Sequence, residues 1–333
     1  MNGQAEAPEA TEGDSPFHAG EREAQRLAGV DARIEKVGRA AIRDHLLPQH
    51  QEFFARQHQL LLATIDAHAR PWVAMVAGPP GFARALDARR LRVDAQPLAG
   101  APDHALSAGG AIAVLGIDYA SRRRNRLNGR ILGSDASGFE IAVQQSFGNC
   151  PKYIQTRATR LPAGASWRLS AQAGEALGHC DDQVRTLIAE ADHFYIATHY
   201  DRDGDRAHHG ADVSHRGGRP GFVRVDADDA LLFPDFAGNR FYNTLGNILA
   251  NGKAALLFTD FSSGSLLSMT GTASIDWRDA SEHGFAGGER LLRFVPQELW
   301  RYPRALPFEW SFGEQSPALE ATGRWADIDS GGG

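Results

Sequence analysis

Two arginines spaced five positions apart are the residues of this sequence best suited to hold an anion. Arg219 and Arg224 flank a short apolar run, which is followed by an acidic turn and a second apolar run, 230–233. From Asn239 onward apolar residues recur at helical spacing, so we expect strand, turn, strand and helix in that order. A helix N-terminus offers free N–H groups and the positive end of the helix dipole, and both stabilise a bound phosphate. The polar residues at this helix start are Arg240, Asn243 and Thr244.

A histidine and an aspartate just before the arginines are candidates for catalysis. Asp212 and His215 precede a Gly-Gly pair, and an imidazole that titrates near neutral pH can hydrogen-bond a cofactor or a substrate. The alternative is that His215 only holds the Gly-Gly turn. His208 and His209 lie nearby, but the segment 204–210 is typical of a loop and does not place these side chains on one helix face. We therefore expect no metal site.

The composition excludes several classes of protein. The chain has 333 residues and a formal net charge of −6, so neither a nucleic-acid footprint nor a basic membrane face is expected. The basic run 122–126 lacks interleaved aromatic residues, and we interpret it as structural or anion-binding. The two cysteines fit a reducing compartment, and no apolar run approaches the roughly 20 residues of a membrane helix. Because the N-terminus has no signal-peptide pattern, we expect a cytoplasmic protein with no membrane or nucleic-acid partner.

A long internal repeat divides the chain. Offsets between matching residues rise slowly along the sequence, which indicates a duplicated unit with small loop insertions. Short strands with one helix per unit predict a mostly β, α+β fold of two small antiparallel barrels in tandem. The expected parts are a disordered tail (1–16), a helical arm (17–47), a first barrel (48–160), a linker (161–178) and a second barrel with a C-terminal extension (179–333). The matches are Ala63-Thr64 with Ala197-Thr198 (134 apart), Pro80-Gly81-Phe82 with Pro220-Gly221-Phe222 (140) and Asp118-Tyr119 with Asp260-Phe261 (142).

Three motifs carry a family resemblance. Asp-Val-Ser-His-Arg-Gly-Gly at 212–218, Pro-Asp-Phe-Ala-Gly-Asn at 234–239 and Asn-Thr-Leu-Gly-Asn at 243–247 resemble a tandem-duplicated bacterial branch of the pyridoxamine 5′-phosphate oxidase superfamily, the FMN-binding split barrels, and the five-residue spacing of Arg219 and Arg224 resembles the superfamily's pair of phosphate-binding basic residues. The resemblance spans about residues 17–325. It implies a tandem of FMN-binding split β-barrels in which Arg219 and Arg224 grip the FMN phosphate. The family's Ser-Arg-Lys at the helix start is replaced here by Tyr242-Asn243-Thr244, with Arg240 just before.

The resemblance also implies how the two copies cooperate. Split barrels of this superfamily usually dimerise with FMN between the subunits, so a tandem copy would build a pseudo-dimer inside one chain. Gln145 and Ser146, after the first barrel, correspond to a Gln-Ser pair that touches FMN in the oxidases. The alternative is a crossover loop fixed by its own amide hydrogen bonds. Since Arg219 matches Pro79 in the first copy, we expect the better site in the second copy.

The function implied is that of an FMN-binding flavoprotein. We expect a flavin-dependent oxidoreductase that acts on a small molecule and receives electrons from a separate reductase. The alternative is a non-enzymatic split barrel that binds flavin or haem. Beyond the pseudo-dimer, a homodimer of whole chains is a further expectation.

Overall fold

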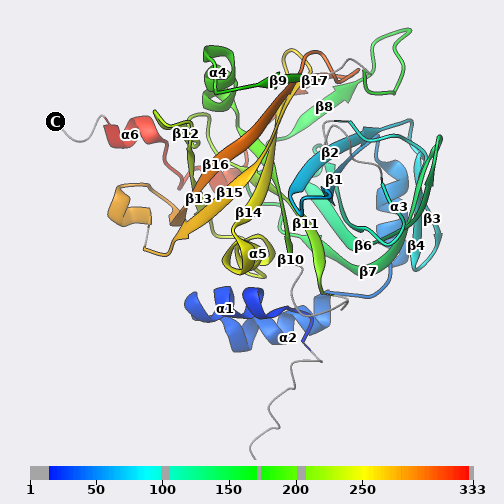
Figure 1. Ribbon diagram of the computed structural model, residues 1–333, viewed down its shortest axis with the longest axis horizontal. Helices are drawn as coiled ribbons and strands as arrows, with labels where there is room; N and C mark the ends of the chain where they lie inside the picture. The colour runs from blue at the N-terminus through cyan, green and yellow to red at the C-terminus, as the bar shows by residue number, and fades with distance from the viewer. Residues whose placement is uncertain (1–14, 99–105, 171–173, 201–207, 279, 330–333) are drawn as a thin grey trace, which may run out of the picture.

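The computed structural model describes residues 15–98, 106–170, 174–200, 208–278 and 280–329 (Figure 1). Nearly all of the tail predicted for 1–16 lies outside these residues. Two curled antiparallel sheets dominate the molecule, one on each side of Figure 1. Within the described residues no helix is both long enough and apolar enough to cross a bilayer.

The first sheet has seven strands in the order β2-β1-β5-β6-β7-β4-β3. Its neighbours pair antiparallel, and its turns are short except between β4 and β5. The strands are β1 (Gln59–Ile65), β2 (Pro71–Ala77), β3 (Ala83–Asp87), β4 (Arg90–Val93), β5 (Ala111–Asp118), β6 (Arg123–Asp135) and β7 (Gly138–Asn149).

The second sheet repeats this order as β11-β10-β14-β15-β16-β13-β12, and β9 pairs with β16 outside that path. Its strands are β9 (Glu175–Leu177), β10 (His193–Tyr200), β11 (Gly210–Gly217), β12 (Arg224–Val225), β13 (Leu231–Phe236), β14 (Lys253–Asp260), β15 (Ser265–Asp276) and β16 (Gly288–Tyr302). A separate ribbon joins β8 (Arg157–Arg160) to β17 (Glu309–Phe312).

The pairing registers establish which residues of the two sheets are equivalent. Ala63 pairs with Val73 in the first sheet, and Ala197 pairs with Val213 in the second. Leu115 pairs with Arg126, as Leu257 pairs with Ser268. The offsets are the 134, 140 and 142 residues of the sequence repeat, and the predicted fold class of tandem antiparallel barrels is confirmed.

Each barrel has its own core, and a third core lies between the barrels. Alternate residues of a strand face opposite sides of a sheet. In β1, Leu60 and Leu62 therefore lie in the core of the first barrel, while Leu61 and Ala63 contact the second barrel. Both faces of the central strands are buried, which explains their continuous apolar runs. The chain thus forms a pseudo-dimer held by an apolar interface.

Short helices cover the ends of the barrels. The predicted arm forms α1 and α2, separated at Gly29, whose φ of +65° favours glycine. α1 packs on α5 so closely that a Cβ at Gly20 would lie 2.3 Å from the Gly246 carbonyl oxygen. The α-helices are α1 (Ala19–Leu27), α2 (Asp31–Ala41), α3 (Pro48–Arg56), α4 (Asp182–Glu190), α5 (Asn243–Asn251) and α6 (Trp325–Asp329), and 3-10 turns span Ala280–His283 and Pro317–Leu319.

Candidate anion-binding site between the two barrels

A polar cavity of about 80 Å³ lies where the first barrel meets the second. It has room for an anion the size of a few water molecules, since each water occupies about 30 Å³. β6 contributes from the first barrel, and β11, the end of β13 and the start of α5 contribute from the second. The polar side chains that line it are Arg124, Arg126, Asn149, Ser214, His215, Arg216, Asp235, Asn239, Arg240, Tyr242, Asn243 and Thr244.

Arg126 ties the two barrels together. Its guanidinium forms a buried ion pair with Asp212 and donates to Ser214 Oγ at 2.5 Å and Asn243 Oδ1 at 3.2 Å. Burial raises the pKa of Asp212, and the charge of Arg126 opposes that rise. Burial also lowers the pKa of Arg126. Each of these two buried charges therefore offsets part of the free-energy cost of burying the other.

Arg124 has no acidic partner among the described residues. Its guanidinium donates to the carbonyl oxygens of Cys150 at 2.6 Å and His215 at 3.2 Å. Burial, together with the nearby charge of Arg126, lowers the pKa of Arg124 to about 10. A cation held this way would be stabilised by an anion in the cavity.

Two more arginines approach from the second barrel. Arg216 forms an ion pair with Asp235, which Arg290 Nη1 also contacts at 2.7 Å. Arg240 pairs with Glu289 at 2.9 Å. The backbone of Arg240 has a φ of +62°, a left-handed conformation that residues other than glycine seldom adopt.

The first turn of α5 faces this cavity without a side-chain cap. Its N-cap, Tyr242, is left-handed with φ +59° and makes no capping hydrogen bond. The amides of an uncapped first turn are free to bind an anion. Thr244 Oγ1 lies 3.2 Å from Ser214 Oγ, while Asn243 Nδ2 donates to Glu21 of α1.

Several of the predicted site residues come together here. Arg240, Asn243, Thr244 and His215 line the cavity, and Asp212 borders it through Arg126. His215 stacks on His193 with ring centroids 5.4 Å apart, and its Nδ1 has no hydrogen-bond partner in the described part of the chain. Burial places the pKa of His215 well below its ordinary value, so this imidazole is neutral at physiological pH.

The predicted phosphate arginines lie elsewhere. Arg219 Nε donates to the Leu319 carbonyl at 3.0 Å, and the Arg224 guanidinium stacks over Trp325 at 4.1 Å. Both contacts are made to the C-terminal segment, which packs over the turn after β11. That segment draws the two side chains away from the cavity, so their part in cofactor binding stays a prediction.

Gln145 and Ser146 also lie outside this cavity. Gln145 Nε2 donates to the Pro16 carbonyl at 3.0 Å. Ser146 Oγ lies 3.0 Å from Nδ1 of His50, and its backbone pairs with Arg43. The β7 segment is thus held by the N-terminal arm and α3, and its contact with a flavin stays a prediction.

Sequence reasoning did not assign three arginines to this site. The basic run 122–126 was interpreted as structural or anion-binding without a place in the fold, but β6 begins at Arg123, so strand alternation puts Arg124 and Arg126 together on the face toward the second barrel. Arg216 follows the candidate His215 directly and lies on the other face of β11. The alternation of Arg124 and Arg126 within the run Arg-Arg-Asn-Arg is the strand-like spacing that could have indicated that these two side chains share one face.

Comparisons with known proteins bear on the fold. A scan against family models finds no match, and a search of curated proteins finds none either. Among solved structures, HupZ of Group A Streptococcus matches at 13% identity over 38% of this chain and 96% of that chain, with a TM-score of 0.29. General stress protein 26 of Bacillus anthracis matches at 12% identity over 39% and 95%, with a TM-score of 0.26.

A Clostridium acetobutylicum protein related to general stress protein 26, of the pyridoxinephosphate oxidase family, matches at 13% identity over 40% and 92%, with a TM-score of 0.26. Each of these matches covers about two fifths of this chain. The description of this last structure names the pyridoxinephosphate oxidase family, the group that the sequence motifs resemble.

Proposed function

We propose that this chain is an FMN-binding flavoprotein that holds the FMN phosphate in the cavity between the barrels. The observation that carries the proposal is Arg124, a guanidinium in the cavity without an acidic partner in the described residues. Arg126, Arg216 and Arg240 converge on the same space. A phosphate dianion would neutralise this excess of positive charge through charge-assisted hydrogen bonds.

The donors around the cavity fit a phosphate. Arg126 Nε, Arg216 Nε and Asn149 Nδ2 are buried donors with no partner among the described residues. Unsatisfied buried donors cost free energy, and an anion with several acceptor oxygens would satisfy them. The uncapped start of α5 adds backbone amides. The sequence has no Gly-x-Gly-x-x-Gly fingerprint after a strand, which favours FMN over a dinucleotide.

The activity we propose is that of an oxidoreductase acting on a small molecule. Bound FMN would supply hydride or electron transfer, and this chain would supply position and electrostatics. The neutral His215 would accept or donate a hydrogen bond beside the cofactor without adding charge, and Asp212 would hold Arg126 in place. We include a separate reductase as the electron source. The free Cys150 and Cys180 support a reducing, cytoplasmic location.

Release of the cofactor tests this proposal. The protein is purified, denatured and its released chromophore separated by chromatography. We expect FMN, or stoichiometric uptake of FMN by protein that is purified without it. Release of FAD, a haem absorption spectrum, or no uptake at micromolar FMN would overturn the assignment. Turnover of NAD(P)H by the loaded protein, without an added reductase, then distinguishes an enzyme from a carrier.

A further inference from the structure

A network of five charged side chains borders the polar cavity between the barrels, named here the arginine cavity. Asp235 accepts hydrogen bonds from Arg216 and from Arg290, whose Nη1 lies 2.7 Å away. Glu289 contacts Arg290 Nη2 at 3.1 Å and Arg240 Nη2 at 2.9 Å. Arg216, Asp235 and Arg240 line the cavity, whereas Arg290 is not among the described residues that line it. Arg290 is therefore the central cation of the network and acts on the cavity through its partners.

Arg290 is buried at a fixed point of the second sheet. It lies opposite Asp235 in the register of β13 and β16, and it is 6% exposed. Its guanidinium carbon lies 5.0 Å from the ring centroid of Tyr242 and 5.0 Å from that of Trp277. Two carboxylates and two aromatic faces thus offset the cost of burying this cation. Together these contacts hold the guanidinium in one position.

The turn between β13 and α5 needs support of this kind. The register of β13 shifts after Asp235, close to the end of the strand. Arg240 and Tyr242 are both left-handed, with φ of +62° and +59°. Residues with a side chain rarely adopt this conformation, and they keep it only where surrounding contacts hold them. Arg290 contacts Tyr242 directly and reaches Arg240 through Glu289.

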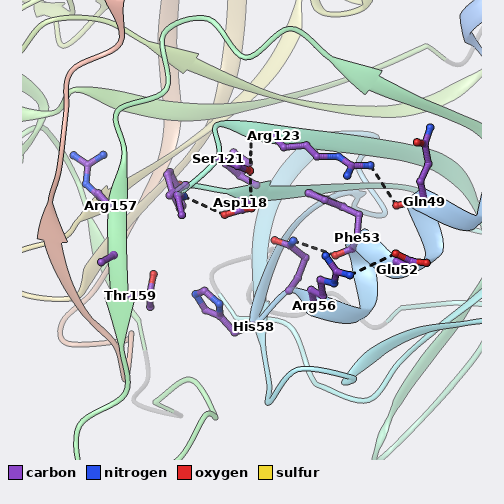
Figure 2. Close-up of a pocket in the computed structure, with 15 residues that line it drawn as sticks. Gln49, Glu52, Phe53, Arg56, His58, Asp118, Ser121, Arg123, Arg157 and Thr159 are labelled. Atoms are coloured by element: carbon purple, nitrogen blue, oxygen red, sulfur yellow. Dashed lines mark hydrogen bonds and ion pairs between the residues drawn. The ribbon is translucent and has the colours of Figure 1, made fainter.

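The cleft drawn in Figure 2 contains arginines without such support. This cleft, of about 580 Å³, lies between α3, the β5–β6 turn and β8. Arg56 contacts Glu52 at 3.5 Å, and its side chain is 78% exposed. Arg123 donates to the Gln49 carbonyl oxygen at 3.3 Å. Among the described residues, neither arginine is linked to another cation by a shared carboxylate. A loosely held arginine loses more conformational entropy when it binds an anion than an arginine that is already fixed.

We propose that Arg290 is a positioning residue for anion binding. From outside the arginine cavity it fixes Arg216, Arg240 and the left-handed N-cap of α5 in the arrangement that receives a phosphate group. The inference rests on the proposed function, in which that phosphate belongs to FMN. Arg290 determines how often the empty site is in its binding arrangement, and the contacts of the bound phosphate are unchanged once the site has formed.

Stopped-flow measurement of FMN binding, followed by flavin fluorescence, tests this role. Arg290→Met leaves each carboxylate of the network with one arginine partner, so the variant should fold. We expect FMN affinity to fall about tenfold, mainly through a lower association rate constant. Arg124→Leu, which removes a direct contact, should instead raise the dissociation rate constant. Unchanged FMN affinity in Arg290→Met, or a loss confined to the dissociation rate constant, would overturn the proposal.

Three further variants isolate the effect. Arg290→Lys keeps the charge but lacks the planar fork that contacts two carboxylates, so it should restore the melting temperature more than the association rate constant. Arg56→Met removes the same charge from the cleft of Figure 2, and Ile188→Val lowers the stability of the second barrel's core. Both should keep wild-type FMN affinity. A loss in either control as large as that in Arg290→Met, or wild-type binding by Arg290→Lys, contradicts the positioning role.

Titration with inorganic phosphate separates this inference from the assignment of FMN. If the wild type binds phosphate but not FMN, the proposed function fails, and Arg290→Met should still bind phosphate about tenfold more weakly. If the wild type and Arg290→Met bind FMN equally well, the proposed function stands and the positioning role is wrong. A wild-type protein that binds neither FMN nor phosphate overturns both.

Discussion

Two strand contacts in this molecule are related by the duplication, and buried charged side chains lie at only one of them among the described residues. β6 of the first barrel meets β11 of the second, and β15 meets β2 in the equivalent place. Arg124 and Arg126 on β6 correspond to Leu266 and Ser268 on β15. Leu266 is fully buried in the core between the barrels.

The facing strands differ in the same way. Asp212, Ser214 and Arg216 of β11 correspond by register to Trp72, Ala74 and Val76 of β2. Those three are at most 1% exposed. The positions that are polar or charged on β11 are therefore apolar and buried on β2, where Ala74 and Val76 pack in the first barrel's own core.

The difference shows what a duplicated chain can do that a symmetric dimer cannot. A homodimer with isologous symmetry must present both contacts with the same residues. Here the apolar contact provides hydrophobic burial, and the polar contact keeps buried charges that cost stability unless they are paired or bound to a ligand. We therefore expect one site per chain, and the predictions below probe that asymmetry.

The largest effect should follow from replacing Arg126 of β6 with serine, the residue found at the equivalent position 268 of β15. Arg126→Ser leaves Asp212 buried without its partner, and we expect the free energy of unfolding to fall by about 3–5 kcal/mol. Urea denaturation measures it. Because burial already raises the pKa of Asp212 and Arg126 opposes the rise, the loss should shrink as the pH falls and Asp212 takes up a proton.

Two controls accompany this variant. Asp212→Asn added to Arg126→Ser should recover part of the lost stability, because no buried charge is left alone. Ser268→Ala at the equivalent position should cost less than Arg126→Ser. A loss for Ser268→Ala as large as that for Arg126→Ser would contradict the asymmetry.

A second substitution separates binding from stability. Arg124→Leu introduces the residue type found at the equivalent position, Leu266. We expect FMN affinity to fall about ten- to a hundredfold, or about 1.5–3 kcal/mol. The melting temperature should not fall, since the guanidinium lacks an acidic partner in the described structure. FMN titration with thermal melting measures both. Arg219→Ala is the matched control, and an equal or greater loss of affinity there would place the phosphate near the C-terminal segment instead.

The N-terminal arm lies over the β6–β11 contact, and its buried titratable groups predict that the stability of the protein depends on pH. Burial raises the pKa of Glu21 to about 8 and lowers that of His18 to about 3. The groups that face Glu21 are Asp212, Arg126, Asn243 and both the backbone amide and the imidazole of His18. A carboxyl that holds its proton only in the folded state loses stability as the pH rises toward its folded pKa.

We expect the free energy of unfolding to fall between about pH 6.5 and 8, by at most roughly 1.4 kcal/mol per pH unit. His18 is neutral in both folded and unfolded chains over most of this range, so it contributes little there. Glu21→Gln should flatten the slope, while Glu23→Gln, on the exposed face of α1, should not. Identical slopes for wild type and Glu21→Gln would show that Glu21 ionises normally.

The sequence predicted the repeated elements because local patterns determine them. The offset between Ala63 and Ala197 is visible without a structure, and so is the helical spacing after Asn239. The side-chain partners of Arg219 and Arg224 depend on Trp325 and Leu319, about a hundred residues away, and no local pattern encodes such contacts. The packing of the N-terminal arm on α5 could not be predicted from a local pattern either, because it depends on the close contact of Gly20 with Gly246.

The smallest effect on affinity should come from the Gln145–Ser146 segment, which the resemblance placed on the flavin. In the structure Gln145 contacts the Pro16 carbonyl and Ser146 contacts His50, and neither lines the arginine cavity. The double variant Gln145→Ala, Ser146→Ala should therefore keep FMN affinity within about threefold of wild type, while the two lost hydrogen bonds lower the free energy of unfolding by about 1–3 kcal/mol. FMN titration and urea denaturation of the same preparation separate the two outcomes. If the folded double variant loses tenfold or more in FMN affinity, this segment contributes to FMN binding. The first barrel would then contribute β7 residues to the site as well as Arg124 and Arg126 of β6.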